Sequence, residues 1–170
     1  MCERTETGTE EIIVKMIEYS DGNLHDINHF MKVYGYARTI GTCEGLSGAE
    51  QKTLEIAAVL HDIACPLCRS RYGNTDGKHQ EEEGILLARD FLQPLQLPEE
   101  MKERVAWLVG HHHTLTGIEG ADYQILIEAD YLVNADESGY SRENIRNMCE
   151  KVFRTGTGKA LLNAMYLSRK

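Results

Sequence analysis

Apolar residues recur with the spacing of an α-helix along almost the whole chain. In the segment from Asp26 to about Gly41, for example, Val33, Ala37 and Ile40 lie on one helical stripe, as expected when one face of a helix is buried. No segment of any length alternates between apolar and polar residues as a half-buried strand does. The sequence therefore predicts an all-α fold of about seven helices.

Capping and turn-forming residues indicate where these helices begin and end. Ser47, with Glu50 three residues later, is typical of a capping box. The segment Cys65–Gly77 contains Pro66 and several Gly, Asn and Asp residues, so we predict a loop there, of a length that is often functional. The predicted helical segments span residues 12–17, 26–41, 47–61, 81–92, 98–112, 121–134, 141–153 and 158–167.

Length and composition favour one soluble domain over residues 1–170. A chain of 170 residues is about one domain long. The 18 Lys and Arg against 27 Asp and Glu give a net charge of -9, which argues against nucleic acid as a partner. No run approaches the roughly 18 apolar residues of a membrane span, and the polar first ten residues do not resemble a signal peptide. We therefore expect a cytoplasmic protein that does not bind membranes.

The cysteines do not suggest a disulfide framework. Five is an odd number, and Cys2, Cys43 and Cys149 stand singly. Cys65 and Cys68 form one CxxC. Free thiols are the favoured interpretation of this pair, and a redox or metal-binding role stays open.

Residues that can bind a metal lie on the apolar stripes of four predicted helices. His29 follows one stripe, and His61 ends the next, with Asp62 directly after it. His112 and Asp130 have similar positions on two later helices. A carboxylate buried among apolar groups is costly unless it is paired or bound to a metal. We therefore predict that these helices converge on a metal site.

The ordered set His29, His61-Asp62 and Asp130 resembles the HD superfamily of metal-dependent phosphohydrolases, whose fold is a helical bundle. The helical contexts are INHFMKVYGYA, AAVLHDIA and ILIEADYLV. The resemblance covers roughly residues 24–135, with residues 141–167 as additional C-terminal helices. It implies that His29, His61, Asp62 and Asp130 bind one divalent ion. Two imidazoles and two carboxylates suit iron, manganese, cobalt, nickel or zinc better than calcium or magnesium.

Some HD proteins hold two metals, and the resemblance leaves that arrangement open here. Their extra ligands are a histidine in a His-x-x-x-Gly pattern and one from a helix such as that ending in GHHHT. The helical stripe selects His112 for the second of these. The first position falls on Gln80, and the nearest histidine, His79, is displaced by one residue. A second ion would therefore use His112 and His79.

The resemblance implies a phosphohydrolase acting on a small phosphorylated metabolite, with a nucleotide as the favoured substrate. Asp62 would be the catalytic residue, a metal ligand beside the attacking water. Related enzymes carry a lysine shortly after His-Asp, where this chain has Cys65. Binding of the substrate phosphate is therefore expected from other residues: Arg69, Arg71, Lys78 or His113.

Two other functions stay open at this point. One is a dinuclear iron oxygenase of the HD type, and the other is a non-catalytic module that binds nucleotides and regulates a partner. The sequence also leaves open the exact substrate, the native metal and whether the chain forms a homodimer.

Overall fold

The computed structural model describes residues 6–168, and within that range every regular element is a helix. This confirms the predicted all-α class. In chain order the elements are α1 Thr9–Tyr19, α2 Leu24–Cys43, α3 Gly48–Leu60, α4 Cys65–Tyr72, α5 Gly77–Leu92, α6 Glu99–Val109, α7 Ala121–Glu137, α8 Arg142–Lys151, α9 Gly156–Leu162 and the π-helix η1 Asn163–Leu167.

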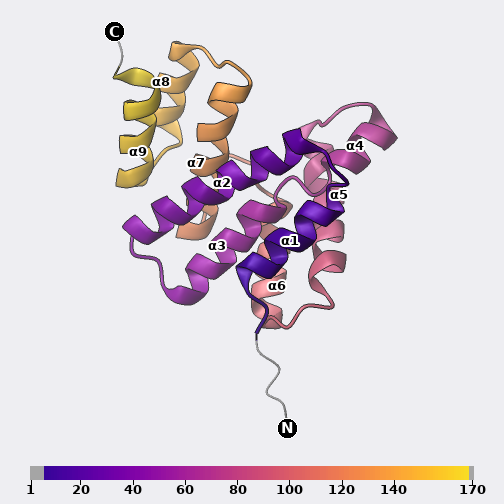
Figure 1. Cartoon of the computed structure of the whole chain (residues 1–170). Coiled ribbons are helices and arrows are strands. Elements are labelled where there is room, and N and C mark those ends of the chain that lie inside the picture. The colour runs from indigo at the N-terminus through magenta and orange to yellow at the C-terminus, as the bar shows by residue number, and fades with distance from the viewer. Residues whose placement is uncertain (1–5, 169–170) are drawn as a thin grey trace.

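Helices α2, α3 and α7 form the centre of the bundle. Helix α2 packs against both α3 and α7, and α3 also contacts α6 and α7. The second half of α3, from Thr53 to Leu60, is buried throughout, as is most of α7. A helix that is buried on all sides belongs to the interior of a fold. Figure 1 shows α2 and α3 crossing the middle of the molecule, with α4 and α5 on one side and α8 and α9 on the other.

The segment Cys65–Gly77, predicted to be a loop, contains the helix α4 over Cys65–Tyr72. The prediction was wrong because Pro66 lies in the first turn, where its missing N–H costs nothing and its fixed φ favours the helix. Gly73 ends the helix in the left-handed region at φ 71°, a conformation that glycine adopts easily. Only residues 73–76 remain between α4 and α5.

Two helix boundaries differ from the predicted ones in ways that affect the site. Helix α5 begins at Gly77 rather than Glu81, because the Asp76 side chain accepts a hydrogen bond from the Lys78 backbone N–H and caps the helix. Helix α6 ends at Val109. His112 therefore lies in the turn that follows α6 and not in the helix itself.

A fully buried carboxylate, Glu128 of α7, holds the start of α9 against the centre of the bundle. Its Oε1 accepts hydrogen bonds from the backbone N–H groups of Arg154, at 2.7 Å, and Thr155, at 3.0 Å. Gly158 lies against the same carboxylate, where an added Cβ would be 2.0 Å from Oε2. Glu128 is thus one of several side chains that join α7 to the C-terminal helices, with Tyr131 bonded to Asn144 and Tyr166 bonded to the Leu132 carbonyl oxygen.

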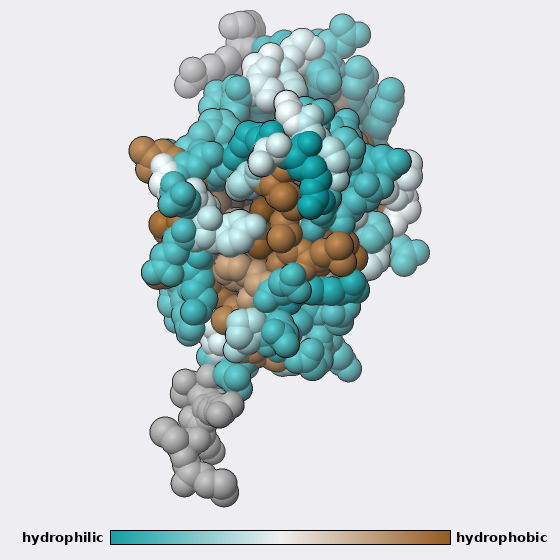
Figure 2. Space-filling model, turned by 90° about the vertical axis from the view of Figure 1, so that its right-hand side faces the viewer, coloured by the Kyte–Doolittle hydropathy of each residue, from teal (hydrophilic) through white to brown (hydrophobic). Residues whose placement is uncertain are grey.

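The described surface combines hydrophilic groups with some large apolar side chains. Leu24 and Leu86 are both more than half exposed. On the face shown in Figure 2, apolar residues form a band bordered by hydrophilic ones. Among residues 6–168, no helix is both long enough and apolar enough to cross a membrane.

Candidate metal centre

Four of the predicted ligands come together from three helices. His29 comes from α2, His61 and Asp62 from the end of α3, and Asp130 from α7. His29 Nε2 lies 3.1 Å from His61 Nε2, 3.3 Å from Asp62 Oδ2 and 3.3 Å from Asp130 Oδ1. His61 Nε2 is 3.5 Å from Asp62 Oδ2 and 3.4 Å from Asp130 Oδ1.

These separations fit a shared ion. Nitrogen and oxygen atoms that bind one transition metal at about 2.0–2.2 Å lie about 3 Å from one another. The donor atoms of His29, His61, Asp62 and Asp130 are 3.1 to 3.5 Å apart in the pairs given above. The chemistry of the set, two imidazoles and two carboxylates, also suits a divalent transition metal.

A second group of donors adjoins the first. One ligand atom from each of Asp62, His112 and His113 lies within 4.8 Å of the others. His112 Nε2 is 3.4 Å from Asp62 Oδ1, the carboxylate oxygen that is not directed at His29. Asp62 therefore presents one oxygen to each group, as a carboxylate shared between two ions does.

Hydrogen bonds orient the three buried histidines for metal binding. The Nδ1 of His61 lies 2.7 Å from the Ala58 carbonyl oxygen, and that of His112 lies 2.7 Å from the Val109 carbonyl oxygen. His29 Nδ1 lies 2.7 Å from Glu137 Oε2. Because these partners only accept, each Nδ1 carries the proton and donates it, which leaves Nε2 as the nitrogen that can bind a metal.

His112 provides the clearest sign of an absent ligand. Its Nε2 atom is buried, and no described residue forms a hydrogen bond with it. Buried polar atoms without a partner are uncommon and call for an explanation. A cation at the centre would satisfy this atom.

The charges of the centre are those of a cation site. Burial raises the pKa of Asp62, but His61 and His112 outweigh burial and hold that pKa below its usual range. Asp130 likewise has a pKa well below its usual range, because its hydrogen bonds with His29 and His61 outweigh burial. Burial lowers the pKa of His29, whereas Asp130, Asp62 and Glu137 raise it to about 9. Both carboxylates are thus charged at neutral pH, and His29 holds a proton unless a metal replaces it.

His79 does not join the centre, although the second metal was predicted to use it. Its ring stacks on Tyr72, with the ring centroids 3.9 Å apart. Gln80 is buried instead and lines a cavity beside the donors. Gln80 lies on the buried face of α5 with Gly84, Ala88 and Leu92, and His79 points about 100° away from that face. His113 occupies the second donor group in its place.

The residues predicted to bind phosphate lie in different environments. Arg69 lines the cavity beside the donors and pairs with Asp26. Arg71 pairs with Glu83, and the Lys78 side chain is 80% exposed. Of these three residues, Arg69 is the one placed to meet a phosphate bound at the centre.

His113 also faces the centre, but as an uncharged group. Partial burial of its ring and the neighbouring His112 lower its pKa to about 4. At neutral pH the uncharged ring can bind a metal through its lone pair or donate its N–H to a phosphate oxygen. Together with Arg69, it lines the smaller cavity, of about 190 Å³.

Two residues of α7 that were not predicted from the sequence, Asn134 and Glu137, support the centre. Asn134 Nδ2 donates a hydrogen bond to Asp130 Oδ1 at 2.8 Å, and Glu137 accepts one from His29. They follow Asp130 by four and seven residues, so all three lie on one face of the helix. This stripe of polar residues is the sequence feature from which Asn134 and Glu137 could have been predicted.

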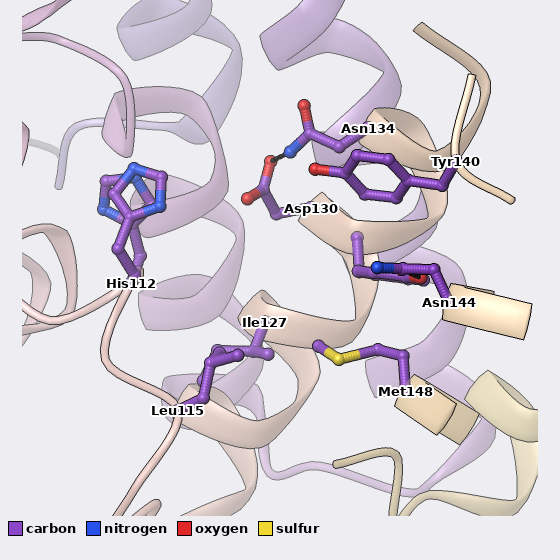
Figure 3. Close-up of a pocket in the computed structure, with 10 residues that line it drawn as sticks. His112, Leu115, Ile127, Asp130, Asn134, Tyr140, Asn144 and Met148 are labelled. Carbon is purple, nitrogen blue, oxygen red and sulfur yellow. Dashed lines mark hydrogen bonds between the residues drawn. The ribbon is translucent and has the colours of Figure 1, made fainter. Parts of the chain in front are cut away.

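A larger cavity, of about 360 Å³, opens on the other side of the donors. Asp130, His112 and His113 line one part of it, and further residues of α7 and α8, together with Leu115 and Tyr140 from the loops before and after α7, line the rest. Figure 3 shows Asp130, hydrogen-bonded to Asn134, between His112 and the side chains of Tyr140 and Asn144. A ligand in this cavity would have direct access to the donor atoms.

Comparisons with known proteins agree with this geometry. A family model described as the HD domain matches residues 26–150. A crystal structure described as a predicted HD superfamily hydrolase from an uncultured Thermotogales bacterium has a similar fold, with a TM-score of 0.66 and 24% identity, covering 97% of this chain and 88% of that one. No curated protein matches. Because the family model spans well over half of the chain, the chain belongs to the HD domain family.

Proposed function

We propose that the protein is a metal-dependent phosphohydrolase that acts on a small phosphorylated metabolite, with a nucleotide as the favoured substrate. The observation that supports this is the convergence of His29, His61, Asp62 and Asp130 beside open cavities. Structural metal sites are closed by protein ligands, whereas catalytic ones keep a position for water or substrate. Membership of the HD domain family points to the same class, the metal-dependent hydrolases.

Each polar group at the centre has a distinct task in this proposal. A bound divalent ion supplies Lewis-acid polarisation of the phosphoryl group and lowers the pKa of water. Asp62, between the two donor groups, orients the attacking water and accepts its hydrogen bond. The water oxygen attacks phosphorus and gives up a proton, the bond between phosphorus and the leaving oxygen breaks, and the leaving oxygen takes up the proton that the water has lost. Arg69, at the edge of the cavity, binds a phosphate oxygen through charge-assisted hydrogen bonds.

The test is a screen for phosphate release. Metal-free protein is reconstituted separately with manganese, iron, cobalt, nickel and zinc, and each form is incubated with nucleoside monophosphates and with simple sugar phosphates. We expect phosphate release that depends on the metal and stops when a chelator is added. If the protein binds nucleotides but none of the metal-loaded forms releases phosphate, the proposed enzymatic activity is contradicted and a regulatory module is favoured.

The second donor group favours one competing function, a dinuclear iron oxygenase. Asp62, His112 and His113 could hold a second ion beside the first. An oxygenase needs two redox-active metals and consumes O₂, whereas a phosphohydrolase works with metals that do not change oxidation state. Phosphate release by the zinc form, together with no O₂ consumption by the iron form, excludes the oxygenase.

A further inference from the structure

The larger cavity has two chemically different parts. Asp130, His112 and His113 belong to the metal centre, and the remaining wall is formed by aromatic, apolar and amide side chains. The residues of that wall are Leu115, Ile127, Tyr131, Asn134, Tyr140, Asn144 and Met148. Figure 3 shows Asn144 and Met148 on the side opposite His112, with Leu115 and Ile127 along one edge. A ligand with its phosphate at the centre would therefore place its remaining atoms against this wall.

The charge of the cavity restricts what that part of the ligand can be. Among the described residues that line it, none is a lysine or an arginine, and Asp130 is already directed at His29 and His61. A second phosphate would find no cation here to pair with. The group that occupies the wall is therefore uncharged.

Asn144 presents hydrogen-bond donors to this group. The Tyr131 hydroxyl donates to Asn144 Oδ1 at 2.5 Å, which fixes the orientation of the amide, since Oδ1 is its acceptor and Nδ2 its donor. The Nδ2 group is then the part of Asn144 that can bind a ligand, and it recognises an acceptor. A carbonyl oxygen or an unprotonated ring nitrogen meets this requirement.

Tyr140 and Met148 add surfaces that suit a planar ring. The ring centroids of Tyr140 and Tyr131 are 5.4 Å apart and the planes are tilted by 39°, while Tyr140 remains 38% exposed. An exposed tyrosine ring stacks readily on a heteroaromatic ring. The flexible thioether of Met148 adapts its shape to a flat ligand and contacts aromatic rings favourably.

We propose that this cavity binds the leaving group of the substrate, and that the leaving group carries an uncharged planar ring with a hydrogen-bond acceptor, as the base of a nucleoside monophosphate does. Asn144 donates to the acceptor of the ring and Tyr140 stacks on its face. The inference rests on the proposed function for the position of the phosphate. Binding of the ring itself requires no catalysis, so it can be measured separately.

The experiment uses chelator-treated protein and ligands without phosphate. Isothermal titration calorimetry with adenosine, guanosine, cytidine, uridine and ribose measures the contribution of the ring directly. We expect at least one nucleoside to bind about tenfold more tightly than ribose, the size expected of one base stacked on an aromatic side chain. Equal affinities for ribose and all four nucleosides would overturn the inference.

A matched pair of variants on α8 tests the role of Asn144. Asn144→Asp keeps the acceptor for Tyr131 but replaces the Nδ2 donor with an anionic oxygen, so nucleoside affinity should fall about tenfold. Asn147→Asp adds the same charge to an exposed position of the same helix that does not line the cavity, and should leave the affinity unchanged. Equal affinities in the two variants would also overturn the inference.

Phosphate release separates this inference from the proposed function. If nucleosides bind as expected but no metal-loaded form releases phosphate, the phosphohydrolase is contradicted and the ring site stands. The opposite result has two parts: ribose 5-phosphate is hydrolysed as efficiently as every nucleoside 5′-monophosphate, and Asn144→Asp leaves kcat/KM unchanged for both kinds of substrate. In that case the phosphohydrolase stands and the ring site is contradicted.

Discussion

His29 and Glu137, which are 108 residues apart in the sequence, form a hydrogen bond of 2.7 Å between Nδ1 and Oε2. Glu137 also accepts a hydrogen bond from the Lys32 ammonium group at 2.8 Å, so its carboxylate is held from two sides. The bond fixes the His29 ring with Nε2 facing the centre and makes that nitrogen a better metal ligand. Glu137 is therefore a positioning residue for the metal.

Replacing Glu137 should weaken metal binding without unfolding the protein. Loss of such a partner typically costs 10- to 100-fold in metal affinity, so we expect Glu137→Ala to lower manganese affinity by about that factor in a chelator competition assay. Glu137→Gln keeps an acceptor oxygen and should recover part of the loss. Asp136→Ala removes an exposed carboxylate next in sequence and serves as the control. Equal affinities in Glu137→Ala and Asp136→Ala would contradict the role of Glu137.

The number of bound ions should depend on His112 and not on His79. With two adjoining donor groups, we expect two equivalents of manganese or iron per chain in the wild type and one in His112→Ala. His79 stacks on Tyr72 and belongs to neither donor group, so His79→Ala should keep both ions. Plasma emission spectrometry of the purified proteins measures this. A single ion in all three proteins would contradict the second site.

Among the three candidate cations, Arg69 should matter most for substrate binding. Arg69, which is paired with Asp26, lines the cavity beside the centre, whereas Arg71, which is paired with Glu83, and the exposed Lys78 do not line it. Arg69→Gln removes a charge-assisted hydrogen bond and should raise KM for a phosphorylated substrate about tenfold. Arg71→Gln and Lys78→Gln should change KM by less than about twofold. A larger effect in either of these two variants than in Arg69→Gln would show that phosphate binds elsewhere.

Glu128 should contribute to stability rather than to catalysis. Its replacement by alanine leaves the backbone N–H groups of Arg154 and Thr155 without their partner, and each buried unpaired group costs about 1–3 kcal/mol. We expect Glu128→Ala to lower the free energy of unfolding in urea by about 2 kcal/mol, with metal content unchanged. Glu150→Ala, at an exposed position of α8, is the control. A change below about 0.5 kcal/mol would contradict this role.

The sequence was sufficient to predict the helical class and four residues of the centre. His29, His61 and Asp130 each lie on a helical stripe that is otherwise apolar, so their burial follows from local periodicity. Burying several such polar groups has a low free-energy cost only where they bind one another or a shared metal ion. Their convergence could therefore be inferred without knowing how the helices pack.

The rest of the site depends on features that local periodicity does not record. The Asp76 cap extends α5 back to Gly77, so that Gln80 is helical and lies on the buried face of the helix with Gly84 and Ala88, facing the cavity. Glu137 lies at the polar end of α7, where a carboxylate usually indicates a solvated surface. The cavity wall combines Leu115 with residues of α7 and α8, which only the tertiary structure brings together.

Metal content and phosphate release, measured side by side in wild type and Asp62→Ala, test the central claim most directly. Asp62 contacts both donor groups, so we predict that Asp62→Ala loses bound metal and phosphate release together while its circular dichroism remains helical. Asp90→Ala, at an exposed position of α5, should match the wild type in all three measurements. Wild-type phosphate release by an Asp62→Ala protein that has lost its metal would contradict the account.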